Sequence, residues 1–235
     1  MPEFLRGFGI LFLYLAVCVS AALIFRKRAS PPHEVFRKTL HLILLLSLIV
    51  WVYAFPDWKT SLFAIAVFVV ITYPVLSVLQ RIKGYSELLT ERKHGEIRNS
   101  LIVVFVMFAV VIAVFWGVVG DKTLVFACIY ALGFGDAAAA LVGKRFGRHY
   151  VTGRLVEGQK SLEGTAAMFV VSFAAVVTIL FIRGGLRWYG YIPTAALTAA
   201  VCASVELYTP RGYDTITCPF AAGAVILPLV QVLAL

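Results

Sequence analysis

The sequence predicts an all-α, polytopic membrane protein, a helical bundle with about eight transmembrane helices. Three observations support this fold class. Of the 235 residues, 61% are hydrophobic and 14% are charged, whereas soluble domains average about 25% charged residues. The mean hydropathy of +0.93 excludes an ordinary soluble enzyme, a disordered chain and a fibrous repeat. Apolar runs near the length needed to cross a bilayer, about 20 residues, recur along the whole chain.

These runs leave too few residues for a separate soluble domain, so we expect 1–235 to form a single integral membrane domain. The expected spans cover 4–25, 39–56, 60–80, 100–120, 122–143, 161–183, 189–206 and 216–235. The first run is interpreted as an uncleaved span, because its basic cluster Arg26-Lys27-Arg28 follows the apolar residues instead of preceding them.

Charge distribution predicts the orientation. Most of the 21 lysines and arginines lie in the odd-numbered loops, and basic residues collect on the cytoplasmic side of membrane proteins. We therefore expect a multi-pass protein with both termini outside and the polar site on the cytoplasmic face. The same asymmetry explains the net charge of +9 without a nucleic-acid partner. The four cysteines lie in or beside apolar runs and are expected to be small buried residues.

Asp136 is the strongest candidate for a functional residue. Placing a carboxylate inside a membrane span costs about 2.5–3.5 kcal/mol of insertion free energy. Gly135, Ala139 and Gly143 recur every four residues around it, which leaves one strip of the helix without bulky side chains. Such a strip allows another backbone to approach closely. The alternative is a packing helix whose aspartate pairs with a basic residue, but intramembrane acids more often serve function.

The connector into the sixth span, 143–165, is rich in glycine and cations. Its basic side chains include Lys144, Arg145, Arg148 and Lys160. Free N–H groups and the dipole at the following helix N-terminus favour an anion. Residues 153–161 nearly match a Walker A loop, but no strand precedes them, so we reject a P-loop fold.

Backbone donors and Lys160 could still hold a polyphosphate in this connector. The alternative is that Ser161 merely caps the helix and Glu163 complements its dipole.

Two further segments carry charged residues at expected inner helix ends. In the first, Glu34 and Lys38 share a helix face, as do Arg37 and His41, because each pair is four residues apart. A snorkelling basic helix end is the alternative there.

In the second segment, Glu206 and Asp214 flank a turn with Pro210 and Gly212, and are either metal ligands or solvated loop acids. Glu96 lies in a segment of alternating charge that favours a solvated loop, although this side chain could face the same site.

At these residues the chain resembles the CTP-dependent lipid kinases: dolichol (polyprenol) kinase, phytol kinase and the yeast-type diacylglycerol kinase. It is related more distantly to phosphatidate cytidylyltransferase. The matching stretches follow the family's order: Glu34…Arg37-Lys38…His41, Gly135-Asp136…Gly143…Gly147, Lys160-Ser161-Leu162-Glu163-Gly164 and Glu206…Asp214…Pro219. One departure is that Thr215 follows Asp214 where the family often has asparagine.

The resemblance implies a kinase that phosphorylates a long-chain lipid alcohol with CTP and a divalent metal, Mg²⁺. Its partners would be the lipid alcohol, the nucleotide and membrane lipids; a homo-oligomer is compatible with the sequence, which does not specify the oligomeric state. Asp136, Lys160 and His41 are the expected catalytic residues. The expected nucleotide-binding residues are Lys144, Arg145, Arg148, Lys160, Ser161, Gly164, Arg37 and Lys38, and the expected metal ligands are Asp136, Glu163, Asp214 and Glu206.

Two other functions stay open from the sequence. A cytidylyltransferase that makes a CDP-lipid would need similar cations, acids and Mg²⁺. A proton-coupled transporter would use Asp136 as a relay, but transporters bind near mid-depth and these polar residues cluster at one face. The enzyme hypothesis requires Asp136 and Lys160 to meet in one pocket.

Overall fold

A computed structural model of the chain describes residues 2–81, 85, 95–153, 156, 160–209 and 213–234. The all-α membrane fold is confirmed, since the described part contains eight helical segments long and apolar enough to cross a bilayer. The segments lie within a few residues of the predicted spans. They divide into two compact units, Met1–Val118 and Val119–Leu235, and each unit is described by itself. The single domain expected from the sequence stays a prediction.

The first unit contains α1 (Pro2–Ala29), α2 (His33–Leu46), α3 (Leu48–Tyr53), α4 (Trp58–Leu79) and α6 (Glu96–Val111), which continues as a π-helix, η1 (Ile112–Val118). Its core is aromatic. Trp51 is fully buried, stacks on Phe55 at 5.8 Å between ring centroids, and meets Phe68 and Phe105 edge-on. Edge-to-face pairs of this kind stabilise a core beyond the area that they bury.

The predicted span 39–56 is interrupted at Ser47, which separates α2 from α3. The Ser47 hydroxyl donates to the carbonyl of Leu44 at 2.6 Å. A serine hydroxyl that bonds a carbonyl of the preceding turn competes with the backbone ladder and bends helices. The apolar pattern continues through this residue, so hydropathy alone could not predict the break.

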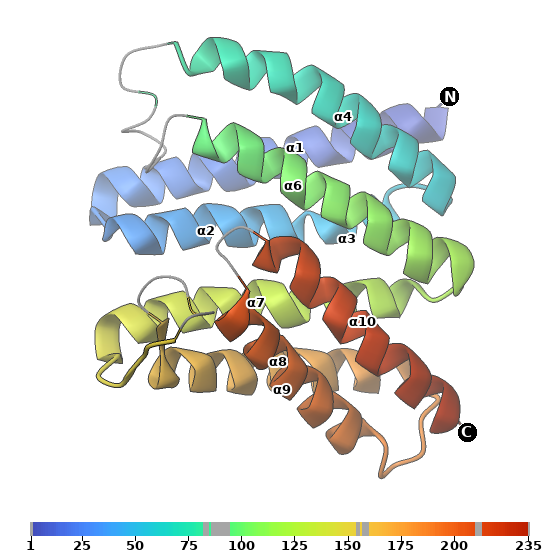
Figure 1. Cartoon of the computed structure of the whole chain (residues 1–235). Helices are drawn as coiled ribbons and strands as arrows, with labels where there is room; N and C mark the ends of the chain where they lie inside the picture. The colour runs from blue at the N-terminus through green and yellow to red at the C-terminus, as the bar shows by residue number, and fades with distance from the viewer. Residues whose placement is uncertain are drawn as a thin grey trace. The chain divides into compact units, whose positions relative to one another are not determined.

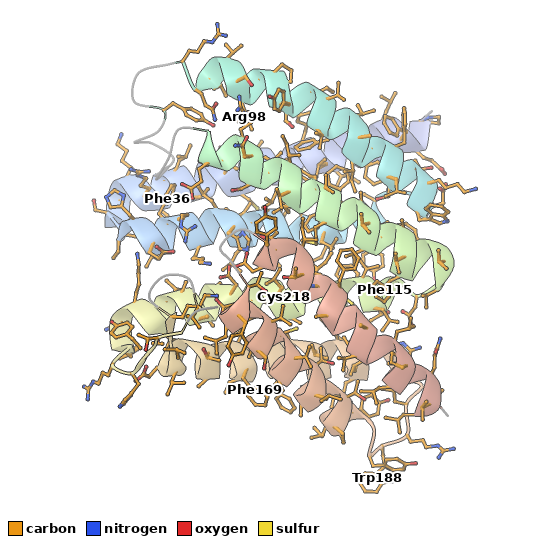
Figure 2. The ribbon with its side chains drawn as sticks, viewed as in Figure 1. Phe36, Arg98, Phe115, Phe169, Trp188 and Cys218 are labelled. Carbon is orange, nitrogen blue, oxygen red and sulfur yellow. The ribbon has the colours of Figure 1, made fainter. Side chains whose placement is uncertain are left out.

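The second unit contains α7 (Lys122–Phe146), α8 (Leu162–Arg183), α9 (Tyr191–Tyr208) and α10 (Asp214–Val232), with a short antiparallel pair of strands, β1 (Tyr150–Val151) and β2 (Lys160–Ser161), between α7 and α8 (Figure 1). α7 packs against all three other helices of this unit. The connector between α8 and α9 is tied to the end of α10 by the Arg187 N–H, which donates to the Leu233 carbonyl at 3.0 Å. Trp188 projects from this connector (Figure 2).

Helices α7 and α8 approach through the strip of small residues that the sequence predicted. A Cβ on Gly135 would clash with the Ser172 hydroxyl, and a Cβ on Gly164 would lie 2.9 Å from the carbonyl oxygen of Ala139. Ser172 donates its hydroxyl proton to the carbonyl of Ala131 at 2.6 Å, which joins the helices by a buried hydrogen bond. The predicted close backbone approach is therefore confirmed, with α8 as its partner.

Asp121 and Arg183 join the same two helices at their other end. Asp121 caps α7 by accepting from the backbone N–H groups of Thr123 and Leu124. Its second carboxylate oxygen lies 2.6 Å from the Nε of Arg183, in the last turn of α8. The acid sits at a helix N-terminus and the base at a helix C-terminus, so both helix dipoles favour the pair.

We predict that Gly164→Ala destabilises the protein by about 2 kcal/mol, because the new methyl group meets a backbone oxygen that cannot move without shifting α7. Thermal unfolding in detergent measures this change. Gly9→Ala in α1 is the matched control, since a Cβ there meets nothing within 4 Å. An equal unfolding temperature for both variants would contradict the proposed contact.

Asp57 caps the N-terminus of α4, and its contribution to stability can be tested. Its carboxylate accepts the Thr60 backbone N–H at 2.9 Å, and this bond lowers the pKa of Asp57 below its ordinary value. We predict that Asp57→Ala costs about 1 kcal/mol at neutral pH. Because the folded pKa is depressed, the contribution of Asp57 is complete above about pH 4 and disappears as the pH falls through the folded value. The difference in unfolding free energy between wild type and Asp57→Ala should therefore be smaller at pH 3 than at pH 6.

Candidate active site

The connector between α7 and α8 is a short hairpin that delivers Lys160 and Ser161 to the start of α8. Tyr150 pairs with Ser161, and Val151 pairs with Lys160. The hydroxyl of Ser161 accepts the Gly164 N–H at 3.1 Å and caps the helix. The capping role considered for Ser161 is therefore present.

Ser161 and Gly164 also pack closely against α7. A Cβ on Gly143 would lie 3.2 Å from the Ser161 hydroxyl, and Gly164 lies against Ala139. Both residues are buried and make these contacts within the unit. Their expected contribution to nucleotide binding stays a prediction.

Lys160 forms the central ion pair of this unit with Glu206, in the last turn of α9. The Lys160 Nζ lies 3.0 Å from the Glu206 Oε1 and also donates to the Glu206 backbone carbonyl. Both side chains are 12% exposed. An ion pair shielded to this degree is screened weakly by water, so either charge alone would be unfavourable.

Glu206 also interacts electrostatically with two other carboxylates, those of Asp136 in α7 and Asp214 at the start of α10. Three helices and the hairpin thus bring three acids and one lysine together. Asp214 further accepts the backbone N–H of Thr215 at 2.9 Å. Cys218, one turn along α10 (Figure 2), is buried beside the same acids and lies near the carbonyl of Cys202. We call Asp136, Lys160, Glu206 and Asp214 the acid–lysine cluster.

The oxygen donors of the cluster suit Mg²⁺, which takes one or two carboxylates and completes its shell with phosphate oxygens and water. Within the described ranges, no three His, Cys, Asp or Glu side chains are grouped closely enough to hold a metal ion by themselves. The Mg²⁺ expected from the resemblance therefore stays a prediction, in which the cluster would supply only part of the ligands.

Glu163, another expected metal ligand, is held by the hairpin. Its Oε1 lies 2.7 Å from the Nδ1 of His149, and both carboxylate oxygens accept the His149 backbone N–H at 3.3 and 3.4 Å. The Leu162 N–H in turn donates to the His149 carbonyl at 2.9 Å. His149 could not be identified from the sequence, because only the hairpin brings it to a residue 14 positions away. The metal-binding role of Glu163 stays a prediction.

The other expected phosphate-binding cations of this unit are exposed at the end of α7 and in the hairpin. They are Lys144, Arg145 and Arg148. Arg145 lies over the ring of Phe146, 5.3 Å from its centroid. Some of the expected residues lie outside the described ranges: 154, 155 and 157–159 of the connector, and 210–212. The turn expected at Pro210 and Gly212 is therefore not described by the structure.

The remaining expected site residues belong to the first unit. Arg37 pairs with Glu34 in the first turns of α2, and its Nη1 lies 3.9 Å from Glu96 at the start of α6. Lys38 is 5% exposed and Glu34 is 8% exposed, which is far less than a snorkelling helix end would have. His41 is partly buried one turn further along α2. The roles expected for Arg37, Lys38 and His41 stay predictions.

No protein-family model matches the chain. The chain is similar to the phytol kinase of Synechocystis, with 27% identity over 92% of this chain and 88% of that protein. Because it covers 92% of this chain, the similarity extends over most of both units.

We predict that Lys160→Met destabilises the protein by about 3 kcal/mol, because the Glu206 carboxylate would keep its charge without its closest cation. The double variant Lys160→Met/Glu206→Leu should recover part of this loss. Thermal unfolding of the four proteins in a double-mutant cycle measures the coupling. Additive effects of the two substitutions would contradict a direct pairing.

Proposed function

We propose that the chain is a membrane-embedded kinase that phosphorylates the hydroxyl group of a long-chain lipid alcohol. A kinase activity toward a lipid alcohol is supported by the similarity to phytol kinase along nearly the whole chain. The use of CTP and Mg²⁺ rests on the sequence resemblance, and the cytoplasmic face rests on the distribution of basic residues; all three belong to the proposal. Among lipid alcohols, the similarity favours a phytol-type prenyl alcohol over dolichol or diacylglycerol.

One observation carries the proposal: Glu206 interacts with Lys160 and with the carboxylates of Asp136 and Asp214. Phosphoryl transfer depends on positioning and charge neutralisation more than on covalent chemistry. The cluster carries both signs of charge and suits a triphosphate beside a lipid substrate. Lys160, Glu206 and Asp214 lie at helix ends, with Asp136 within α7, whereas a transporter site would be expected mainly near the middle of the helices.

In the proposed reaction the lipid hydroxyl attacks the γ-phosphorus of CTP, the bond between the γ-phosphorus and the β,γ-bridging oxygen breaks, and CDP leaves. Asp136 accepts the hydroxyl proton, and Lys160 neutralises phosphate charge. Lys160 is already held by Glu206, so we expect the triphosphate to share its ammonium group with that carboxylate. When bound, Mg²⁺ would neutralise further phosphate charge next to Asp136, Asp214 and Glu206.

The cytidylyltransferase alternative uses the same nucleotide but breaks a different bond. Purified protein is supplied with CTP labelled at the α- or the γ-phosphate, Mg²⁺ and a panel containing phytol, a shorter prenyl alcohol, a polyprenol, diacylglycerol and phosphatidate, the last as the acceptor that a cytidylyltransferase would need. We expect lipid to acquire the γ-label alone, most rapidly with the prenyl alcohols. Transfer of the α-label would contradict the kinase proposal. The same assay with ATP tests the nucleotide preference.

We predict that Asp136→Asn lowers the transfer rate at least about 100-fold, the lower range for loss of a general base. The unfolding temperature should change little, since asparagine preserves the shape of the side chain. Glu3→Gln, which neutralises an exposed acid near the N-terminus, is the control and should keep full activity. A fully active Asp136→Asn enzyme would remove Asp136 from the chemistry.

A further inference from the structure

The connector between α8 and α9, residues 184–190, lies at the end of these helices that is opposite to the acid–lysine cluster. Lys160 comes just before the N-terminus of α8, and Glu206 lies in the last turn of α9. The connector instead joins the C-terminus of α8 to the N-terminus of α9. The proposed phosphoryl transfer uses none of its residues, so its exposed side chains need an explanation of their own.

Two aromatic residues occupy the tip of a tight turn in this connector. The Gly190 N–H donates to the Arg187 carbonyl at 2.7 Å, which leaves Trp188 and Tyr189 as the two central residues of the turn. Trp188 is 85% exposed and Tyr189 is 46% exposed, and Figure 2 shows Trp188 projecting from the connector. Turns more often carry glycine, proline, asparagine, aspartate or serine. Two exposed rings at this tip therefore indicate an environment that favours them.

Hydrogen bonds hold the turn in place against the three helices around it. The Arg187 N–H donates to the Leu233 carbonyl, directly after α10, at 3.0 Å. The Leu186 N–H donates to the hydroxyl of Tyr191, the first residue of α9, at 3.4 Å. The Tyr191 ring in turn stacks on Phe181 of α8, with 4.4 Å between the ring centroids. A turn anchored in this way presents its rings in a fixed direction.

The exposed surface changes character between the helices and the turn. At the turn, the Arg187 Nη1 donates to the Tyr189 hydroxyl at 3.0 Å, and the Trp188 and Tyr189 rings meet edge to face at 5.8 Å between centroids. The neighbouring helix ends expose large apolar side chains, those of Phe181, Ile182 and Ile192. Apolar groups, then aromatic rings with polar edges, then a cation is the order that suits a path from hydrocarbon to lipid headgroups.

Helix length places the turn at this boundary. Both α8 and α9 are long and apolar enough to span a bilayer. The 18 residues of α9 extend about 27 Å at about 1.5 Å per residue, which is close to the hydrocarbon thickness of about 30 Å. Because the connector is short and tied to the helix ends, Trp188 and Tyr189 cannot extend far from the membrane surface.

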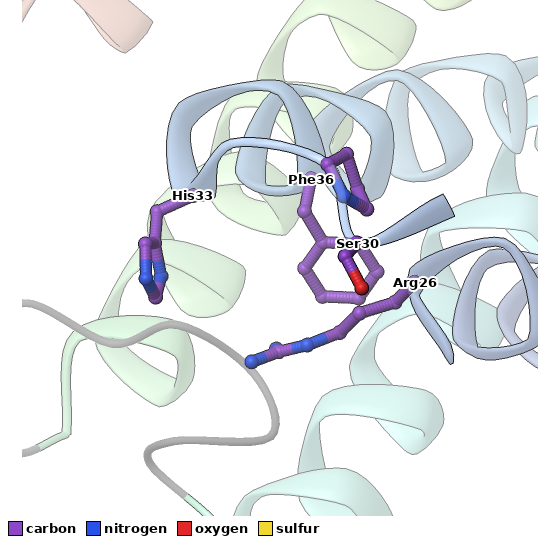
Figure 3. A pocket seen from close by; sticks show the side chains of 5 residues that line it. Arg26, Ser30, His33 and Phe36 are labelled. Atoms are coloured by element: carbon purple, nitrogen blue, oxygen red, sulfur yellow. The ribbon is translucent and has the colours of Figure 1, made fainter. Parts of the chain in front are cut away.

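Exposed aromatic rings are not a general property of the connectors between these spans. Where α1 is followed by α2, the Phe36 ring is 1% exposed, and the guanidinium carbon of Arg26 lies 4.8 Å from its centroid. Figure 3 shows the Arg26 side chain extending past this ring. The ring at that connector is covered by its own unit, so the exposure of Trp188 is a feature of the α8–α9 connector itself.

From these observations we propose that the turn at 187–190 inserts Trp188 and Tyr189 into the boundary between lipid headgroups and hydrocarbon, on the membrane face opposite to the acid–lysine cluster. Lipid is the partner of this surface, because both helices that carry the turn cross the bilayer. Interfacial aromatic anchors set the tilt and depth of helices, so the turn also sets the depth of Lys160 and Glu206 at the other helix ends. The insertion does not depend on the proposed kinase activity.

Depth-dependent quenching of tryptophan fluorescence tests the proposal with the full-length protein in phosphatidylcholine nanodiscs. Trp188 is the one tryptophan among residues 119–235, and its signal is the difference between wild type and Trp188→Phe. The nanodiscs contain lipids that carry a spin label either close to the headgroup or near the end of the acyl chain. We expect the shallow label to quench Trp188 at least about twofold more than the deep label, because the indole ring favours the interface.

Val170→Trp in the Trp188→Phe background is the matched control. Val170 is 60% exposed near the middle of α8, so a tryptophan there should be quenched more by the deep label. Circular dichroism and the unfolding temperature check that each variant is folded. Quenching of Trp188 mainly by the deep label or by aqueous acrylamide would contradict the proposal. A Trp188 signal that neither lipid label changes would also overturn it, since a second copy of the chain covering the turn would give that result.

Discussion

The contact of Gly164 with the Ala139 carbonyl sets how closely α7 and α8 approach, and the geometry of the second unit depends on this distance. With the helices this close, Ser161 fits above Gly143 and caps α8. Lys160, one residue earlier, is then delivered by the hairpin to the end of α9, where it meets Glu206. A bulkier residue at 164 would move the cap, the hairpin and the lysine together, because all three are attached to the same turn.

The ends of this helix pair are secured by two different kinds of interaction. Asp121 and Arg183 complement the dipoles of α7 and α8 at one end. At the other end, the hairpin and the contact between His149 and Glu163 close the connector over the first turn of α8. The polar groups that could carry chemistry are collected at this second end. Asp136 extends the cluster into the span, where the proposed lipid hydroxyl would meet a carboxylate within the apolar environment.

Much of this arrangement could be predicted, because its causes are local. Eight apolar segments follow from hydropathy, and the recurrence of Gly135, Ala139 and Gly143 indicated the face of α7 that another helix would cover. The break at Ser47 and the β1–β2 pair could not be predicted. Both depend on particular hydrogen bonds, which neither the apolar pattern around Ser47 nor the glycines of the connector specify. The partnership of His149 with Glu163 was missed for the same reason.

The sequence by itself determined that this chain is a helical membrane protein with a carboxylate inside a small-residue helix face, because span length, hydropathy and helical periodicity act over short stretches. Only the tertiary structure decided that Glu206, 46 residues beyond Lys160, is the acid that holds the lysine, and that Asp136 and Asp214 interact with that same acid. Pairing between distant residues depends on which helix faces pack together, and several acids in the sequence were equally available to Lys160 before the helices were packed.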